Sequence, residues 1–274
     1  MRILNALLGG IINGLLFPFR SFPPLVGLTV VSVLTGVAML LVFRATSNQE
    51  GIKAAKRRIA AGVFEIRLFN DDPRAILRAQ ADILRHTLTY MGLTMVPVLW
   101  MIVPLVLLII QLEFHYGYAG LEPAGTALVK VTVTAASASA APDVSLDTDA
   151  GIEVESPLLW IPSLREANWR IAARDPGDHE LRVVIGGEVF AKRVRVTDAV
   201  VRLAPVRPSS RILDQLLYPA ERPLPASAPV ESITVTYPHA TIGVLWWEAH
   251  WIVVFFVLTI VIAFVLQRPF KVTL

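Results

Sequence analysis

The chain has 274 residues and no cysteine, which excludes disulfide bonds and metal sites built from thiolates. The short motifs of common catalytic centres are missing as well. There is no glycine-rich phosphate loop, no His-Glu-x-x-His helix and no nucleophile elbow. We therefore expect neither an enzyme nor a protein that needs a cofactor or a metal. Lysine is scarce, with 5 lysines against 20 arginines, and this bias indicates a GC-rich bacterial genome.

Charged side chains are almost absent from three apolar stretches, and 54% of all residues are hydrophobic. The mean hydropathy of +0.59 lies well above that of soluble domains, so part of the chain belongs in lipid. Residues 25–44 and residues 93–112 are each long enough to span a bilayer as a helix. The third stretch, residues 251–266, needs some upstream residues to reach that length, which places the third predicted span at 244–266.

The loops between these stretches differ in charge. Residues 47–91 carry eight Lys or Arg against five acidic residues, whereas residues 113–248 carry twelve against seventeen. The positive-inside rule then places the 47–91 loop and the C-terminal tail, residues 267–274, in the cytoplasm. The large 113–248 segment is predicted to lie outside. We expect a multi-pass protein of a bacterial cytoplasmic (inner) membrane, although Arg2 and Arg20 weigh mildly against this orientation.

Residues 1–20 precede the first span and are predicted to form an amphipathic helix. Leu4, Leu8, Ile11 and Leu15 make one apolar stripe, while polar and small residues recur on another face. A helix that lies in the outer membrane interface is the favoured interpretation. A re-entrant segment or full span, or a signal peptide without an Ala-x-Ala-like cleavage site, are the alternatives.

Residues 47–91 have the pattern of a coiled-coil hairpin of two antiparallel helices, 49–68 and 73–90. Asp72 is a good N-cap and Pro73 a favoured first helical residue, so the turn between the helices is tight. Seven-residue spacing of apolar side chains is typical of packed antiparallel helices. The second helix is therefore predicted to carry an apolar stripe of Ile76 and Ile83 and to pack through a parallel row of Leu77, Leu84 and Met91.

A basic cluster lies near the start of this hairpin, formed by Lys53, Lys56, Arg57 and Arg58. Such a cluster binds phosphate without sequence preference, so anionic lipid or ribosomal RNA is a candidate partner. The alternative is that a short cytoplasmic loop folds into a helical hairpin that rests its basic face on the membrane lipids.

This order of elements resembles the Oxa1/YidC superfamily, above all its small three-span branch of archaeal proteins and the third subunit of the ER membrane complex. The resemblance rests on residues 23–111, including "KAAKRRIAAGVFEIRLFNDDP" and "LTMVPVLWMIVPLVLL", and on residues 251–266. It implies a biogenesis factor that helps hydrophobic client proteins enter the bilayer through a polar groove. It also implies a hairpin that docks a ribosome or chaperone, with a second copy or a partner membrane subunit completing the core, and no DNA partner.

Polar side chains within the spans are candidates for such a groove, because polar groups in lipid are costly and usually functional. Their alternative role is ordinary helix packing through small residues. The arginine that such insertases often carry in the groove is missing from both spans. The groove candidates are Thr29, Ser32, Thr35 and Thr94, with Arg44 and Arg85 at the rim.

Residues 121–197 are predicted to form an all-β, immunoglobulin-like sandwich. Gly186-Gly187 marks a two-residue hairpin turn between strands 179–185 and 188–196. "DPGDHEL" is similar to the tyrosine corner of such folds, with His179 in the tyrosine position. Residues 198–241 are predicted to be a proline-rich connector with a short helix and a strand that could join the sandwich.

A scaffold subunit that binds an extracytoplasmic partner through the β-domain is the alternative function, and a transmembrane sensor is a third. Five polar residues near the outer membrane boundary are weak candidates for a metal or proton site. The competing interpretation is an interfacial belt beside Trp246, Trp247 and Trp251. The five are Glu113, His115, His239, Glu248 and His250.

Overall fold

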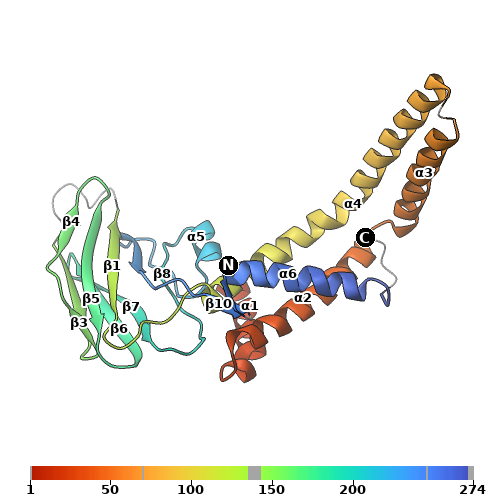
Figure 1. Ribbon diagram of the computed structural model, residues 1–274. Coiled ribbons are helices and arrows are strands. Elements are labelled where there is room, and N and C mark those ends of the chain that lie inside the picture. Colours follow the sequence, from red (N-terminus) through yellow and green to blue (C-terminus); the bar gives the residue numbers. More distant parts are fainter. Residues whose placement is uncertain (1, 70, 135–142, 245, 271–274) are drawn as a thin grey trace. The chain divides into compact units, whose positions relative to one another are not determined.

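The computed structural model describes residues 2–69, 71–134, 143–244 and 246–270 (Figure 1). The chain divides into two compact units. One unit contains residues Met1–Gly27 and Leu108–Ile252, and the other contains Leu28–Leu107 and Val253–Leu274. Each unit is described by itself below.

Four helices form most of the second unit. By length and composition, two of them are long and apolar enough to cross a membrane. These two are α2 (Pro24–Thr46) and α4 (Pro73–Tyr116). Helix α3 (Gln49–Leu68) lies between them in the chain, and α6 (Trp251–Leu266) follows the β region. The predicted third span at 244–266 is wrong in its start, because residues before Trp251 form the short strands β10 (Ile242–Val244) and β11 (Trp247–Ala249).

Helix α4 is a single helix of 44 residues, whereas the sequence pattern predicted a hairpin helix that ends near residue 90 and a separate span. Pro97 and Pro104 both lie inside it. Each proline removes one backbone hydrogen bond, and the helix continues through the apolar residues on both sides. The hairpin and the second apolar stretch are therefore one continuous element.

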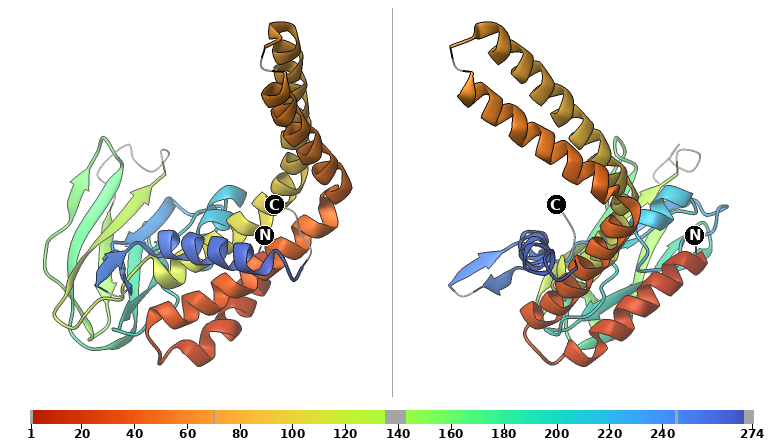
Figure 2. Two further views of the ribbon diagram at one scale, coloured as in Figure 1. Left: turned by 45° about the vertical axis from the view of Figure 1, so that its right-hand side comes forward. Right: turned by 90° about the vertical axis from the view of Figure 1, so that its right-hand side faces the viewer.

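The hairpin of α3 and α4 forms as predicted, and the two helices run side by side in Figure 2. Asp72 Oδ1 accepts a hydrogen bond of 2.9 Å from the backbone N–H of Arg74, which confirms the N-cap. The predicted stripe is confirmed at Ile83, which lies against Gly62 of α3, whereas the predicted parallel row is wrong. Leu77, Leu84 and Met91 are 66%, 61% and 51% exposed, while Ala55, Gly62 and Ala79 are buried. Small side chains let the two helices approach closely, so the larger row faces outward.

The N-terminal segment is helical, as α1 (Arg2–Leu16) followed by a short 3₁₀ turn, Phe17–Phe19. Ile12 and Leu16 are buried, and Asn5 donates a hydrogen bond of 2.6 Å from Nδ2 to the carbonyl of Gln215. The face of α1 that contains Asn5, Ile12 and Leu16 therefore packs on its own unit. The apolar side chains Ile3, Leu7 and Ile11 are 78%, 60% and 65% exposed.

The β region consists of antiparallel sheets. The larger sheet has the strand order β3-β5-β1-β9-β8, with β4 also pairing with β5, and a second sheet has the order β2-β6-β7. Both sheets contribute to one hydrophobic core that includes Trp169, Ile171 and Leu181. The strands are β1 (Thr126–Val133), β2 (Val144–Thr148), β3 (Ile152–Val154), β4 (Leu159–Ile161), β5 (Glu166–Ala173), β6 (Gly177–Ile185), β7 (Glu188–Val196), β8 (Val206–Arg207) and β9 (Val230–Val235).

Two local features of this region agree with the sequence pattern. Gly186 and Gly187 have φ angles of 57° and 81° and join β6 to β7, as the hairpin turn requires. His179 Nε2 lies 2.8 Å from the carbonyl oxygen of Asp175, four residues upstream. The His179 ring thus holds the turn between β5 and β6 through a contact with the backbone.

The domain boundary at residue 197 is wrong, because the predicted connector is part of the β region. Strand β9 pairs with β1 over the length of the larger sheet, and β8 pairs with β9. The predicted short helix is present as α5 (Ile212–Leu217), with Ser209 Oγ accepting a hydrogen bond from the backbone N–H of Arg211. Strand β1 is therefore an inner strand of the larger sheet, with β5 on one side and β9 of the later segment on the other.

Candidate functional site

The groove candidates on α2 are used in helix packing. Ser32 and Thr35 are buried, and their hydroxyls donate hydrogen bonds of 2.8 Å to the carbonyls of Leu28 and Val31. One turn away, a Cβ on Gly36 would lie 3.1 Å from Ile262 Cγ2 and 3.3 Å from the carbonyl oxygen of Thr259 in α6. Bonding of hydroxyls to their own helix and close approach at glycine are typical of packed membrane helices.

The other groove candidates lie apart from this contact. Thr29 is half-buried on α2, and the Thr94 hydroxyl donates to the carbonyls of Tyr90 and Met91 within α4. Arg44 is exposed and donates from Nη1 to the carbonyl of Phe270 at 3.4 Å, while Arg85 is exposed on the hairpin. The six candidates therefore do not converge on one site.

The basic cluster of the hairpin is divided between two environments. Lys53, Arg57 and Arg58 are exposed on α3. Lys56 instead turns toward α4, where its Nζ lies 5.4 Å from the centroid of the Tyr90 ring. Such a cation–π contact holds the ammonium against the helix pair. Three of the four predicted residues thus remain open to an anionic partner.

The outward row of α4 is a second surface of the hairpin. Leu77, Leu84, Leu88 and Met91 are each between 51% and 66% exposed. Their spacings of seven, four and three residues align them on one face of the helix. Arg74, Arg78 and Arg85 occupy the neighbouring positions around the helix, so the row has a basic edge. We call these four apolar residues the outward row.

The close contact between α3 and α4 can be tested at Gly62. A Cβ there would lie 2.6 Å from Ile83 Cγ1, so Gly62→Leu should force α3 away from α4 and destabilise the hairpin by about 1–3 kcal/mol. Hydrogen–deuterium exchange of residues 49–68 measures this change. Gly92→Ala is the matched control, because nothing lies within 4 Å of its Cβ and alanine should strengthen the helix by about 0.5–1 kcal/mol. Unchanged protection in Gly62→Leu would contradict the close contact.

The five weak candidates for a metal site do not lie together. In the part of the chain that the structure describes, no three His, Asp or Glu side chains form a group that could hold a metal ion. Each of the five candidates has its own neighbour instead. His115 Nε2 lies 2.9 Å from Asn13 Oδ1, and the His239 ring stacks on that of Tyr118. Glu113 Oε2 accepts a hydrogen bond of 2.9 Å from Trp251 Nε1, and the His250 ring lies beside the ring of the same tryptophan. Glu248 accepts a hydrogen bond from Thr241.

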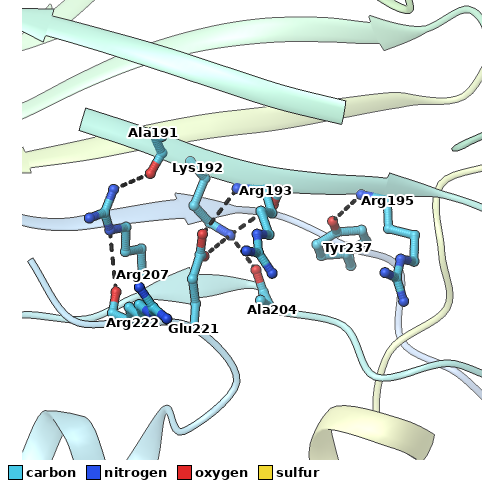
Figure 3. A network of polar contacts seen from close by, with 9 residues as sticks. All are labelled: Ala191, Lys192, Arg193, Arg195, Ala204, Arg207, Glu221, Arg222 and Tyr237. Carbon is cyan, nitrogen blue, oxygen red and sulfur yellow. Dashed lines mark hydrogen bonds and ion pairs between the residues drawn. The ribbon is translucent and has the colours of Figure 1, made fainter. Parts of the chain in front are cut away.

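A buried ion pair that the sequence pattern did not indicate joins β7 to the segment after α5 (Figure 3). Lys192 is fully buried, and its Nζ donates to Glu221 Oε2 at 2.7 Å, to the carbonyl of Arg193 at 3.0 Å and to the carbonyl of Ala204. Glu221 Oε1 also accepts from the backbone N–H of Arg193 at 3.1 Å. Burial lowers the pKa of Lys192 below its ordinary value, and the charge of Glu221 opposes this effect.

Beside the pair, the network continues through two further side chains. Arg207 donates to the carbonyl of Ala191 and, at 3.3 Å, to the carbonyl of Arg222. Tyr237 Oη accepts a hydrogen bond of 3.0 Å from the backbone N–H of Arg195, and burial raises the pKa of Tyr237 to about 12. These contacts connect β7 to the segments on both sides of α5.

A pocket of about 710 Å³ opens over this network, between α1 and the segment around α5. Three arginines line it, namely Arg202, Arg207 and Arg222, together with Glu221. Arg202 Nη2 donates to Gln111 Oε1 at 3.0 Å and to the carbonyl of Pro219 at 2.9 Å. Its Nε is buried and has no hydrogen-bond partner among the described residues.

Sequence reasoning missed this pocket, and only a weak signal for it existed. The arginines lie in a stretch without periodicity, and a fold with two sheets was needed to bring them to α1. The one available hint is Gly9, whose absent side chain leaves room for Arg202. A Cβ at Gly9 would lie 2.1 Å from Arg202 Nη1.

Comparison with known proteins adds no assignment. No protein-family model, no curated protein and no solved structure matches this chain.

Proposed function

We propose that this protein is a scaffold subunit of a membrane complex, with α2, α4 and α6 as three spans. In this proposal the hairpin and the C-terminus lie in the cytoplasm of a bacterial cell, and the β region lies outside as an immunoglobulin-like domain. The difference in basic charge between the loops supports this orientation. The observation that carries the proposal is the outward row of α4, an unpartnered apolar face with a basic edge.

The packing of α2 favours a scaffold over a polar groove. A groove for client segments needs polar side chains that are open to lipid or water. Ser32 and Thr35 are instead buried with their hydroxyls bonded, next to the close approach of Gly36 to α6. The proposal assigns no reaction to the chain.

The surface of the hairpin defines the chemistry of its cytoplasmic partner. Apolar residues at helical spacing accept the apolar stripe of another helix. The arginines beside the row favour acidic residues at the edge of that stripe. We therefore propose a partner segment that is an amphipathic helix with an acidic border.

Site-specific crosslinking in the native cell tests this proposal. A photoreactive residue at position 84 lies in the outward row, and one at position 89 is the matched control because Thr89 is exposed on α4 outside the row. We expect one stoichiometric partner from position 84 and none from position 89. Replacement of Arg78 and Arg85 by Glu should abolish the crosslink, while Arg67→Glu on α3 should not. Equal crosslinking from both positions would contradict docking on the outward row.

A biogenesis factor of the Oxa1/YidC type is the second candidate, and the outward row also favours it, because exposed apolar side chains can hold a hydrophobic client segment. The same crosslinking experiment separates the two. Many short hydrophobic nascent chains at position 84, with ribosomes in the purified sample, would support the biogenesis factor. One complex recovered at fixed stoichiometry would support the scaffold.

A further inference from the structure

The arginine-lined pocket described above carries an excess of positive charge. Arg202, Arg207 and Arg222 line it, and the carboxylate of Glu221, which also lines it, is already paired with Lys192. Three arginines thus share one lining carboxylate, Glu221, which is bonded to Lys192 and also acts on Arg207 through its charge. Guanidinium groups bind phosphate oxygens through paired N–H donors, and they do so more strongly than neutral donors.

Arg202 is an arginine of the pocket with a buried donor that lacks a partner among the described residues. Two of its contacts go to neutral acceptors, Gln111 Oε1 and the carbonyl of Pro219. Its Nε is buried without a hydrogen-bond partner among the described residues, and an unpaired buried donor on a charged group is costly. Burial also lowers the pKa of Arg202. An anion in the pocket would compensate for this buried charge.

A second pocket of about 360 Å³ shares Arg202 and extends the basic region. Arg20, Arg193 and Arg195 line this second pocket. Arg195 is paired with Asp178, so part of its charge is neutralised. The shared arginine makes the two cavities neighbours, and an extended headgroup can contact both.

The two helices that contribute to the first pocket also carry exposed apolar side chains. Asn5 and Ala6 of α1 line the pocket, and Ile3, Leu7 and Ile11 on another face of the same helix are exposed. Gln215 of α5 lines it as well, while Ile212 and Leu213 of α5 are 67% and 64% exposed. A helix with apolar side chains on its open face is typical of the membrane interface. A ligand that combines an anionic group with acyl chains would use both the pocket and these apolar faces, whereas a freely soluble ion would use the pocket alone.

We propose that the pocket between α1 and the α5 segment binds the phosphate headgroup of an anionic phospholipid, with the acyl chains beside the exposed faces of α1 and α5. The proposal rests on the membrane location in the proposed function, but it does not depend on the partner of the hairpin. The chemistry that it requires is a phosphate headgroup with a net negative charge, without a cationic group of its own, attached to an apolar tail.

Binding of short-chain lipids to the full-length protein in neutral detergent tests the proposal. The probes are dihexanoyl phosphatidylglycerol, dihexanoyl phosphatidylcholine and inorganic phosphate, each titrated and followed by thermophoresis. We expect saturable binding of the phosphatidylglycerol, with at least about tenfold weaker binding of the other two probes, because one charge-assisted contact is worth that factor. Equal affinity for phosphatidylcholine would overturn the requirement for an anion, and equal affinity for inorganic phosphate would overturn the lipid.

Variants locate the binding in the pocket. Arg222→Gln removes an exposed arginine of the lining without disturbing a buried contact, and Arg202→Gln removes the central one. Each should weaken phosphatidylglycerol binding about tenfold. Arg170→Gln removes the same charge from an exposed position of β5 outside this pocket, and its affinity should stay within about twofold of the unmodified chain. Unchanged affinity in Arg222→Gln, or an equal loss in Arg170→Gln, would overturn the proposed site even if the hairpin docks its partner as proposed.

Discussion

Replacement of Glu221 by alanine is expected to lower the free energy of unfolding of the β region by about 3–5 kcal/mol, because it leaves the fully buried ammonium of Lys192 without its counter-ion. The change also removes the acceptor of the Arg193 backbone N–H. Hydrogen–deuterium exchange of residues 188–196 in the full chain measures the loss, since these residues form β7. Glu221 lies in a proline-rich segment, so its substitution disturbs no helix or strand directly.

Two further variants distinguish the ion pair from a general effect of substitution. Glu180→Ala removes an exposed glutamate of β6 whose pairing with Arg182 is a surface contact, so it should change stability by less than about 1 kcal/mol. The double variant Lys192→Met with Glu221→Leu removes both charges and should recover most of the stability. A double variant that is as unstable as Glu221→Ala would contradict the view that the unpaired charge is responsible.

The sign of the pH dependence of stability follows from the direction in which the pKa of Lys192 is shifted. Burial holds this pKa below 10.5 in the folded chain, and the charge of Glu221 acts in the opposite sense. The Glu221→Ala variant loses this opposing effect, so the pKa of Lys192 falls further. Between the folded pKa and 10.5 the unfolded chain therefore binds more protons than the folded chain. Stability then rises with pH across this interval. The Glu221→Ala protein should regain stability as the pH approaches 10, and more steeply than the unmodified chain does.

The helices were largely predictable from sequence because their signals are local. Asp72 followed by Pro73 marks the start of α4, and long apolar runs with almost no charged residues mark the two long apolar helices. The packing between α3 and α4 was not predictable in the same way. Leu77, Leu84 and Met91 have the expected spacing, but the close approach at Gly62 leaves no room for them between the helices. Spacing identifies a face of a helix, whereas the size of the opposing residues decides which face is buried.

In the β region the local turns were predictable, whereas the pairing of distant strands was not. The turn at Gly186-Gly187 and the alternation of β1 follow from neighbouring residues, and both are present. The pairing of β9 with β1 joins positions about 100 residues apart, as Ser232 and Thr132 show. The sequence pattern indicated a strand in segment 198–241 that could join the sandwich, but nothing local marks its partner, so the segment as a whole was predicted to be a connector. The same long-range closure brings Glu221 to Lys192 and the arginines to α1, and for this reason the pocket was missed.

A methyl group at Gly120 is expected to destabilise the junction between the end of α4 and the β region by about 3 kcal/mol. The Cβ of Gly120→Ala would lie 2.1 Å from the carbonyl oxygen of Thr197, and a backbone atom cannot move aside as a flexible side chain does. The two hydrogen bonds that join Leu121 to β7 and Thr197 flank this point, with lengths of 3.3 Å from Leu121 N to Arg195 O and 2.9 Å from Thr197 N to Leu121 O. Displacement of the backbone would weaken both.

This junction matters for the proposed scaffold, because the last residues of α4 belong to the same compact unit as the sheets. Exchange of residues 108–121 should therefore rise in Gly120→Ala, together with that of β7. The matched control is Gly243→Ala, the same substitution at a position of β10 where nothing lies within 4 Å of the new Cβ, and its exchange should not change. If Gly120→Ala exchanged at these residues as slowly as the control, α4 would not be held to the β region at this contact. In that case binding of a partner to the hairpin could not affect, through α4, the binding of a partner to the β-domain.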